Sequence, residues 1–405
     1  MTTTINNEHK KLNVPNLRFP EFQGEWEEER LADIADLYKG TGILSKDQLS
    51  DDGEPCILYG ELYTKYKSET IREVISKTNI NNTKLVKSKA NDVIIPCSGE
   101  TAEDIATARC VLNGNILLGG DLNIIRLHGY DGAFMSYQLN GRRKYDIAKV
   151  AQGVSVVHLY GEHLKGVKTI NPCLEEQKKI AKLLSLLDER IATQNKIIED
   201  LKKLKSAIIE KHYCKVEKQI ACVGDLGEPF SVGNLAKDDL TETGIPCVIY
   251  GELFTTYGET ISQIESHTYK TEGIILSKKG DLLFPSSTTV DAMSLIAPSV
   301  INMDGVILGG DMFGIHISPN FNAQYLSYYF NHIAKRQLAK FAKGSTIIHL
   351  HYADIEKAKL LLPSLEEQNR MAKCLVTLDD KIKKERTFFD LLNSQKAYLL
   401  CHMFI

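Results

Sequence analysis

The stretch "PCLEEQKKIAKLLSLLDERI" (Pro172–Ile191) opens with a proline, continues with two glutamates and then repeats apolar residues at helical spacing. Proline and acidic residues suit the first turn of a helix, where backbone N–H groups are free and the dipole is positive. A second copy, "PSLEEQNRMAKCLVTLDDKI", occupies Pro363–Ile382. The sequence therefore predicts two long helices, each beginning just after its proline.

Both predicted helices carry a repeat in which seven of nine positions, spaced alternately four and three residues apart, are apolar. The polar steps are Gln194 and Lys205 in the first helix, and Glu385 and Lys396 in the second. This period of 3.5 residues is typical of a coiled coil, in which polar residues weaken the seam but fix its register. If the helices pair antiparallel, Gln194 and Glu385 fall opposite each other. Two unrelated surface helices are the alternative.

The duplication extends over nearly the whole chain. "PCILYGELYTKY" (Pro55–Tyr66) returns as "PCVIYGELFTTY" (Pro246–Tyr257), and each copy lies among short β-like runs broken by Gly, Asn and Asp. We predict a mixed α/β fold with internal pseudo-two-fold symmetry: two similar globular domains and two long helices that form an antiparallel coiled coil. The predicted segments are a domain over 1–170, a helix over 171–215, a domain over 216–361 and a helix over 362–405.

Composition and net charge exclude few classes of function. The chain has 405 residues, 43% hydrophobic and 25% charged residues, and a net charge of −3. These values are those of an ordinary globular protein, and a local basic stripe on such a protein can still bind nucleic acid. Its nine cysteines contain no C-x-x-C pair, and its opening residues are polar. We therefore expect reduced thiols, no zinc site, no signal peptide and no membrane span.

Few residues suggest catalysis. The chain lacks G-x-G-x-x-G, G-x-x-x-x-G-K-[ST] and H-E-x-x-H. A Cys–His pair could come from Cys56 with His158, or from the equivalent Cys247 with His349, but cysteines in apolar runs usually pack in the core. Asp121 and Asp311, in the two "GGD" turns, could bind a metal. An Asp after two glycines more often stabilises the turn itself. We predict neither a catalytic residue nor a metal ligand.

Tyr, Thr, Ser, Lys and Glu side chains can contact phosphates or base edges, and they gather in three repeated stretches. The alternative for the tyrosine-rich stretch is a strand with alternate tyrosines buried. We predict DNA contacts in the first copy at Tyr59, Glu61, Tyr63, Thr64, Lys65, Tyr66, Ser98, Thr101 and Ser155, and in the second at Tyr250, Glu252, Thr255, Thr256, Tyr257, Ser287, Thr288, Thr289, Ser345 and Thr346.

The whole arrangement resembles the specificity (S) subunit of type I restriction–modification systems. The opening "VPNLRFPEFQGEWEEERLADI" (Val14–Ile34) is similar to the N-terminal lead of that family. "GSTIIHLHYADIEKAKLLLPSLEEQNRMAKCL" (Gly344–Leu375) is similar to its domain-ending signature, and Gly153–Leu184 carries the signature in looser form, with Val154 inserted before the serine.

The resemblance implies that each globular segment is a target recognition domain for one half of a bipartite DNA site. It also implies that the helices set the gap between the halves and dock two methyltransferase subunits, which two restriction/motor subunits join. S-adenosylmethionine, ATP and Mg²⁺ would belong to those partners in the cytoplasm, and this chain would bind no cofactor and be non-catalytic. The alternative is a coiled-coil scaffold for protein binding without DNA specificity, which predicts no salt-sensitive DNA affinity.

Overall fold

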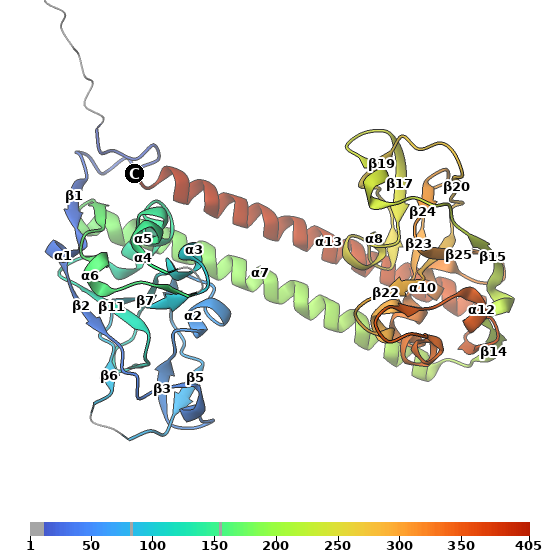
Figure 1. Cartoon of the computed structure of the whole chain (residues 1–405), viewed down its shortest axis with the longest axis horizontal. Helices are drawn as coiled ribbons and strands as arrows, with labels where there is room; N and C mark the ends of the chain where they lie inside the picture. The colour runs from blue at the N-terminus through green and yellow to red at the C-terminus, as the bar shows by residue number, and fades with distance from the viewer. Residues whose placement is uncertain (1–11, 82–83, 154–155) are drawn as a thin grey trace, which may run out of the picture. The chain divides into compact units, whose positions relative to one another are not determined.

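The computed structural model describes residues 12–81, 84–153 and 156–405 (Figure 1). The chain forms two compact units. Unit 1 extends to Asn195 and also includes Thr387–Ile405, whereas unit 2 comprises Lys196–Arg386. Each unit therefore contains one globular region together with a part of both long helices.

The main sheet of unit 1 is built around the apolar run "DVIIP", which forms β7 (Asp92–Pro96) and is buried along its whole length. A strand covered on both faces needs such a continuous apolar run. β7 pairs antiparallel with both of its neighbours. The five strands, in sheet order, are β2 (Ala35–Lys39), β11 (Leu122–Leu127), β7, β9 (Arg109–Val111) and β4 (Thr70–Ile71).

A smaller sheet of unit 1 carries the repeated tyrosine-rich stretch at the end of one strand. Its strands, in order, are β5 (Ser76–Thr78), β3 (Glu54–Ile57), β10 (Leu117–Leu118) and β6 (Val86–Lys87). β3 and β10 are parallel, with Cys56 opposite Leu117. The strand β10 continues into the "GGD" turn, so this turn and the residues after β3 leave the sheet at the same edge.

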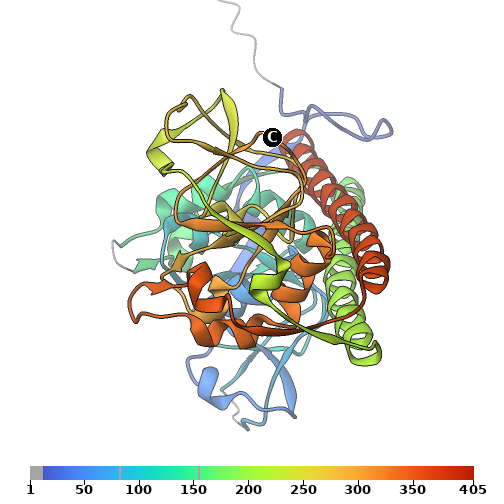
Figure 2. The ribbon, with the colours of Figure 1, turned by 90° about the vertical axis from the view of Figure 1, so that its right-hand side faces the viewer.

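Unit 2, whose globular region is drawn in yellow to orange in Figure 2, repeats both sheets. Its main sheet has the order β15 (Gly227–Ser231), β25 (Met312–Ile317), β21 (Asp281–Pro285), β23 (Ser299–Ile301) and β18 (Thr260–Ile261). Its smaller sheet has the order β16 (Leu240–Thr241), β19 (Ser266–Thr268), β17 (Ile245–Ile249), β24 (Ile307–Gly309) and β20 (Ile275–Leu276). The predicted pair of similar mixed α/β domains is confirmed.

One buried glutamine in each unit joins the start of a long helix to a helix that covers the main sheet. In unit 1, Gln177 donates to the carbonyl of Pro172 (2.8 Å) and accepts from the N–H of Asp131 (2.9 Å), the N-cap of α4 (Gly132–Asn140). In unit 2, the Gln368 side chain makes the same two bonds, donating to the Pro363 carbonyl and accepting from the N–H of Asn322, the N-cap of α10 (Ala323–His332). The repeated "LEEQ" sequence therefore fixes how each long helix leaves its domain.

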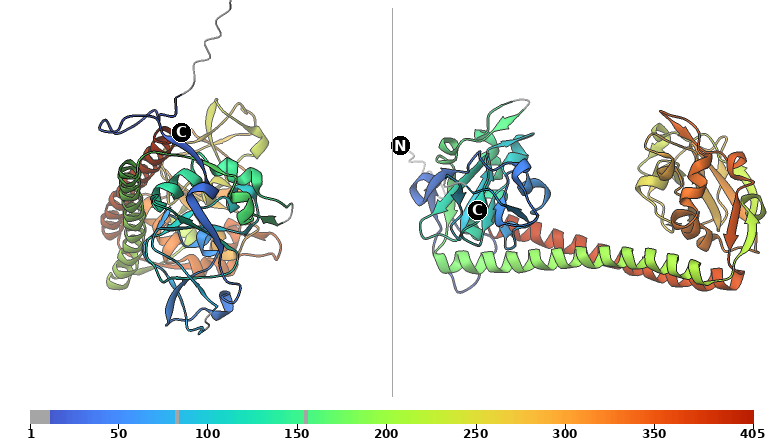
Figure 3. Two further views of the ribbon diagram at one scale, coloured as in Figure 1. Left: turned by 90° about the vertical axis from the view of Figure 1, so that its left-hand side faces the viewer. Right: turned by 90° about the horizontal axis from the view of Figure 1, so that it is seen from below.

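The two long helices are α7 (Leu174–Lys215) and α13 (Leu365–His402). Figure 3 shows them side by side in unit 1, where the early α7 residue Asp188 lies 2.7 Å from the late α13 residue Lys396. In unit 2 the late α7 residue His212 lies 3.0 Å from Glu367 near the start of α13. The helices are therefore antiparallel, as predicted. Within the described residues, no helix is long and apolar enough to cross a membrane.

The predicted apolar seam is buried or half-buried in both helices. In unit 1, Ile180 and Leu184 join the core together with Met403 and Phe404, which follow the end of α13. The polar positions Lys205 and Lys396 are paired with carboxylates, as described below. Gln194 belongs to unit 1 and Glu385 to unit 2, and their opposition stays a prediction.

Glu259 makes unit 2 sensitive to acid. Burial raises the pKa of this carboxyl, but His332 and Lys205 outweigh it and lower the pKa from 4.5 to about 2. The folded pKa is below the unfolded one, so the carboxylate stabilises the folded state above pH 4.5 and loses this contribution as the pH falls toward 2. The contribution at neutral pH is about 3 kcal/mol.

We expect the stability difference between the wild type and Glu259→Gln to shrink steadily between pH 4.5 and pH 2. Urea unfolding followed by circular dichroism at several pH values measures it. Glu272→Gln removes an exposed carboxyl of the same unit and is the matched control. A Glu259→Gln profile that stays parallel to the wild type in this range would contradict the assignment.

Candidate nucleic-acid interface

The tyrosine-rich stretch of unit 1 is a turn and one helical turn rather than a strand. The strand β3 ends at Ile57, and α2 (Glu61–Thr64) follows after three residues. The Glu61 carboxylate accepts a hydrogen bond from the N–H of Leu58 (2.9 Å), which closes the turn. The alternative of an aromatic strand with alternate tyrosines buried is therefore wrong.

Glu61 and Tyr66 use their polar atoms inside the domain. The buried Glu61 carboxylate accepts from the Ser76 hydroxyl and pairs with Lys65 (2.7 Å). The Tyr66 hydroxyl, also buried, accepts from the N–H of Ile75 (3.2 Å). Both were predicted as DNA contacts, but these bonds make them the scaffold that holds the turn.

Unit 2 repeats this scaffold. The buried Glu252 carboxylate accepts from the N–H of Ile249 (2.9 Å) and from the Ser266 hydroxyl (2.5 Å). The Tyr257 hydroxyl accepts from the N–H of Glu265 (3.1 Å), and burial raises its pKa to about 12. The G-E-L-[YF]-T-x-Y repeat therefore encodes a turn of fixed shape in each unit.

The residue just before the repeated glycine of each turn, Gly60 or Gly251, is presented to solvent. Tyr59 is 39% exposed and Tyr250 is 36% exposed, each at the tip of its turn. The threonines Thr64 and Thr255 are exposed, and their hydroxyls donate to the carbonyls of Gly60 and Gly251. The exposed Lys65 of unit 1 is replaced by Thr256 in unit 2. The two turns therefore share their shape and their tyrosine tip, and differ in charge.

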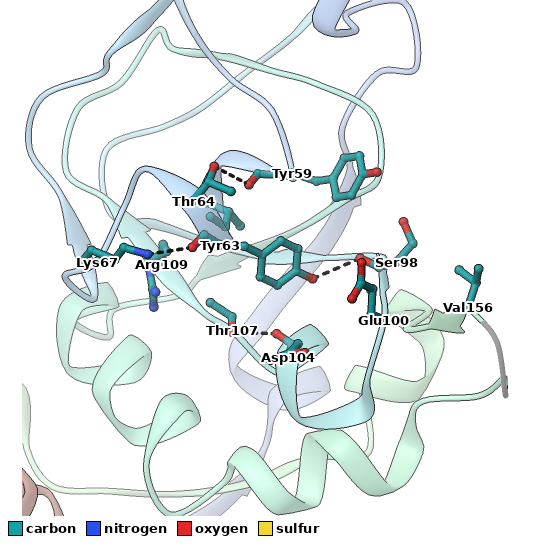
Figure 4. A pocket seen from close by; sticks show the side chains of 13 residues that line it. Tyr59, Tyr63, Thr64, Lys67, Ser98, Glu100, Asp104, Thr107, Arg109 and Val156 are labelled. Carbon is teal, nitrogen blue, oxygen red and sulfur yellow. Dashed lines mark hydrogen bonds between the residues drawn. The ribbon is translucent and has the colours of Figure 1, made fainter. Parts of the chain in front are cut away.

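Two cavities flank the turn of unit 1. The first, about 740 Å³, lies between α2 and the segment after β7, where the Tyr63 hydroxyl donates to the carbonyl of Ser98 (3.1 Å) (Figure 4). Lys67 and the largely buried Arg109 also line it. The second, about 820 Å³, has Tyr59 on its wall too, with contributions from Lys39, Lys46, Asp121, His158 and Tyr160.

The other predicted residues lie in surrounding segments. Ser98 lies in β8 (Ser98–Gly99), which pairs with β12 (Val157–His158), whereas Thr101 caps α3 (Ala102–Ile105) with its hydroxyl. In unit 2, Ser287 is buried and Thr288 half-buried, whereas Thr289, Ser345 and Thr346 are exposed. Ser155 lies outside the described residues, next to Val156, which lines the first cavity.

The sequence prediction missed several residues of the candidate interface. Lys39 lies over the ring of Tyr160 (5.6 Å), which also stacks with His158 (6.1 Å). Lys67 and Arg109 contribute positive charge to the other cavity. Exposed aromatic rings beside cations are groups that bind nucleic acid through stacking and phosphate contacts. The recurrence of "HL" at His158 and His349 could have indicated His158, which the sequence suggested only as the partner of Cys56 in a Cys–His pair.

The chemical alternatives have no support in this site. Cys56 and Cys247 are fully buried, and burial raises the pKa of each thiol to about 11, so neither is a thiolate at neutral pH. Asp121 has a φ of 55°, a left-handed conformation that suits the end of the "GGD" turn. No group of three metal-ligating side chains occurs within 12–81, 84–153 and 156–405.

We expect Glu61→Ala to lower the free energy of unfolding by about 2–3 kcal/mol, because it leaves the buried hydroxyl of Ser76 and the half-buried N–H of Leu58 without their acceptor. Chemical denaturation measures the loss. The matched control is Glu100→Ala, which removes an exposed carboxylate from the first cavity. Equal stability of the two variants would show that Glu61 does not hold the turn.

Comparison with known proteins identifies the family. A model of the type I restriction modification DNA specificity domain matches residues 23–203 and 215–387. The type I restriction enzyme MjaVIII specificity subunit of Methanocaldococcus jannaschii is 25% identical, with 91% of this chain and 89% of that protein covered. The putative type I restriction enzyme MjaX specificity subunit of the same organism is 23% identical, over 93% of this chain and 92% of that protein.

Solved structures share the fold across both units. The S subunit of a type I restriction–modification system from M. genitalium gives a TM-score of 0.65 at 17% identity, with 97% of this chain and 99% of that chain covered. A chain from a study of complex assembly and conformational transition of the type I R-M system gives 0.54 at 14% identity, over 94% and 97%. Because the family model matches both halves of the sequence, the chain belongs to the type I restriction modification DNA specificity family.

Proposed function

We propose that the chain gives a type I restriction–modification complex its DNA sequence specificity, with each unit reading one half of a bipartite target. One observation carries this proposal: both family-domain matches contain the same hydrogen-bonded turn, and each turn presents a tyrosine to solvent. A scaffold that keeps its shape while its exposed side chains differ is suited to reading related but distinct sequences.

The two cavities of unit 1 are lined by both cations and carboxylates, so phosphate contacts would fall to individual lysines. Lys39, Lys46 and Lys67 line the two cavities together with Tyr59 and Tyr160, whereas Lys65, which lines the second cavity, is paired with Glu61. Lysines of this kind neutralise phosphates and supply affinity that falls with added salt, whereas the aromatic and hydroxyl groups reach base edges or sugars. A net charge of −3 over the whole chain does not prevent these lysines from contacting phosphates.

The long helices have a further role in the proposal. Apolar side chains on them are exposed in the chain alone: Leu183, Leu186, Ile197 and Leu204 on α7, and Leu391 and Tyr398 on α13. Uncovered apolar groups on a helix pair are suited to packing against further helices. We propose that two methyltransferase subunits dock there and that two restriction/motor subunits complete the complex.

In this proposal, the partner subunits carry out the chemical reactions. S-adenosylmethionine, ATP and Mg²⁺ would bind to the partner subunits, and this chain would be a non-catalytic subunit without a cofactor. Because the proposed substrate is cellular DNA, the complex would act in the cytoplasm. A protein-binding scaffold without DNA specificity differs in one measurable way, since its DNA affinity would not fall steeply with salt.

Because both turns carry G-E-L-[YF]-T-x-Y, we propose that the half-sites are related and read as an inverted pair on opposite strands. They need not be identical. Lys65 and Tyr63 of unit 1 correspond to Thr256 and Phe254 of unit 2, so the two turns offer different hydrogen-bonding groups.

We expect Tyr59→Ala to weaken selection of one half-site and Tyr250→Ala to weaken selection of the other, each by about tenfold to a hundredfold, as a mismatched base pair does. Sequences recovered from a randomised duplex pool by the protein with its methyltransferase subunits measure this. Tyr145→Ala, which removes an exposed tyrosine of α5 (Lys144–Val150) that lines neither cavity, is the control and should leave both half-sites unchanged. A Tyr59 or Tyr250 variant that alters both half-sites equally, or neither, would overturn the assignment.

A heptad inserted into both helices, after Asn195 in α7 and after Arg386 in α13, preserves the seam and the pairing inside each unit. Each helix becomes about 10 Å longer. We expect the unread gap to lengthen by about three base pairs with unchanged half-sites, as measured by the same selection. An insertion in α7 alone, after Leu201, displaces Lys205 from Asp379 and should abolish assembly. An unchanged gap in the paired variant would contradict the role of the helices as spacers.

A further inference from the structure

A buried ionic cluster in unit 1 joins three parts of the molecule. The amino group of Lys396 on α13 lies 2.7 Å from Asp188 on α7 and 2.6 Å from Glu69 of the globular region. Asp188 also accepts hydrogen bonds from the hydroxyls of Tyr137 (2.7 Å) and Ser68 (2.9 Å). Asp188 and Glu69 are each 8% exposed. One lysine is therefore bonded to the other long helix and to the globular region at once.

Unit 2 contains the equivalent cluster, with the roles of the helices exchanged. Lys205 on α7 lies 2.7 Å from Asp379 on α13 and 3.0 Å from Glu259 of the globular region. Tyr328 donates to Asp379 (2.5 Å), as Tyr137 does to Asp188, while His332 lies 2.9 Å from Glu259. Each lysine thus comes from a helix whose other end enters the other unit.

The clusters lie directly after the tyrosine-bearing turns. Glu69 lies three residues after Tyr66, and Glu259 lies two residues after Tyr257. Each glutamate begins a Glu-Thr-Ile sequence, which enters β4 in unit 1 and β18 in unit 2. In unit 1, Arg109 donates to the carbonyl of Tyr66 (3.2 Å). The peptide that ends the turn is therefore held between the main sheet and the ion pair with the helix.

We propose that Lys396 and Lys205 are positioning residues that fasten the tyrosine-bearing turn of each unit to both long helices, so that the position of each turn is set by the helix pair. This deepens, and rests on, the proposed reading of a bipartite target. Compared with well-packed apolar side chains of similar volume, a buried ion pair adds little net stability, because desolvation offsets the attraction, whereas the geometry it imposes is specific. A lysine that has to satisfy two carboxylates from different elements has one acceptable placement.

Hydrogen exchange on the intact protein tests the fastening without DNA. We expect Lys396→Met to accelerate exchange at least tenfold in residues 66–71 and 109–112, with 257–261 unchanged. Lys205→Met should do the reverse. Lys203→Met removes an exposed lysine of α7 and is the control. Should Lys396→Met fail to fold, Glu69→Gln, which keeps the shape of the side chain, should accelerate the same segments. Unchanged exchange in these segments, or acceleration spread over both units, would overturn the proposal.

DNA binding separates positioning from a general loss of structure. Against duplexes whose gap differs by one base pair, the wild type should prefer one length, and Lys396→Met should lower that preference at least tenfold. A merely structural role would weaken binding to all lengths by the same factor, which would overturn the positioning role. A wild type without gap preference would refute the proposed function instead, and hydrogen exchange would still decide whether the lysines fasten the turns.

Discussion

The apolar seam between α7 and α13 is the constraint on which the rest of the structure depends. In unit 1, seam residues of α7 such as Ile180 and Leu184 share a core with Phe134 of the globular region and with Phe404 at the end of the chain. In unit 2, Met371 and Leu375 of α13 enter the core beside Ile209 of α7. Neither globular core is complete without both helices, and burial of these side chains drives the association.

Polar groups along the same helices give the seam its specificity. Apolar packing tolerates sliding by a heptad, whereas a lysine that must meet two carboxylates does not. The buried glutamine at the start of each helix acts in the same way, since Gln177 and Gln368 each bond to the N-cap residue of a helix on the main sheet. The position of each tyrosine-bearing turn therefore follows from a few buried bonds at the helix surface.

Sequence periodicity predicted the long helices because their apolar residues recur over many turns, and the duplication predicted two similar domains. The shape of the turn could not be predicted in this way. Glu61 closes the turn through a local bond with the N–H of Leu58, but its carboxylate is also held by Ser76, fifteen residues away, and a bond between distant residues leaves no local pattern. The ionic clusters could not be predicted for the same reason. Periodicity identified Lys205 and Lys396 as polar seam positions, but their partners Glu259 and Glu69 lie far from them in the sequence.

The central claim is that two units held by one helix pair read two halves of a single DNA site. Genome-wide mapping of methylated adenines in cells that carry this protein with its methyltransferase subunits tests it most directly, because target and gap are read together. The account predicts one bipartite motif with two related, inverted half-sites and a gap of fixed length. Methylation at a single continuous motif, or at half-sites with variable gaps, would contradict it.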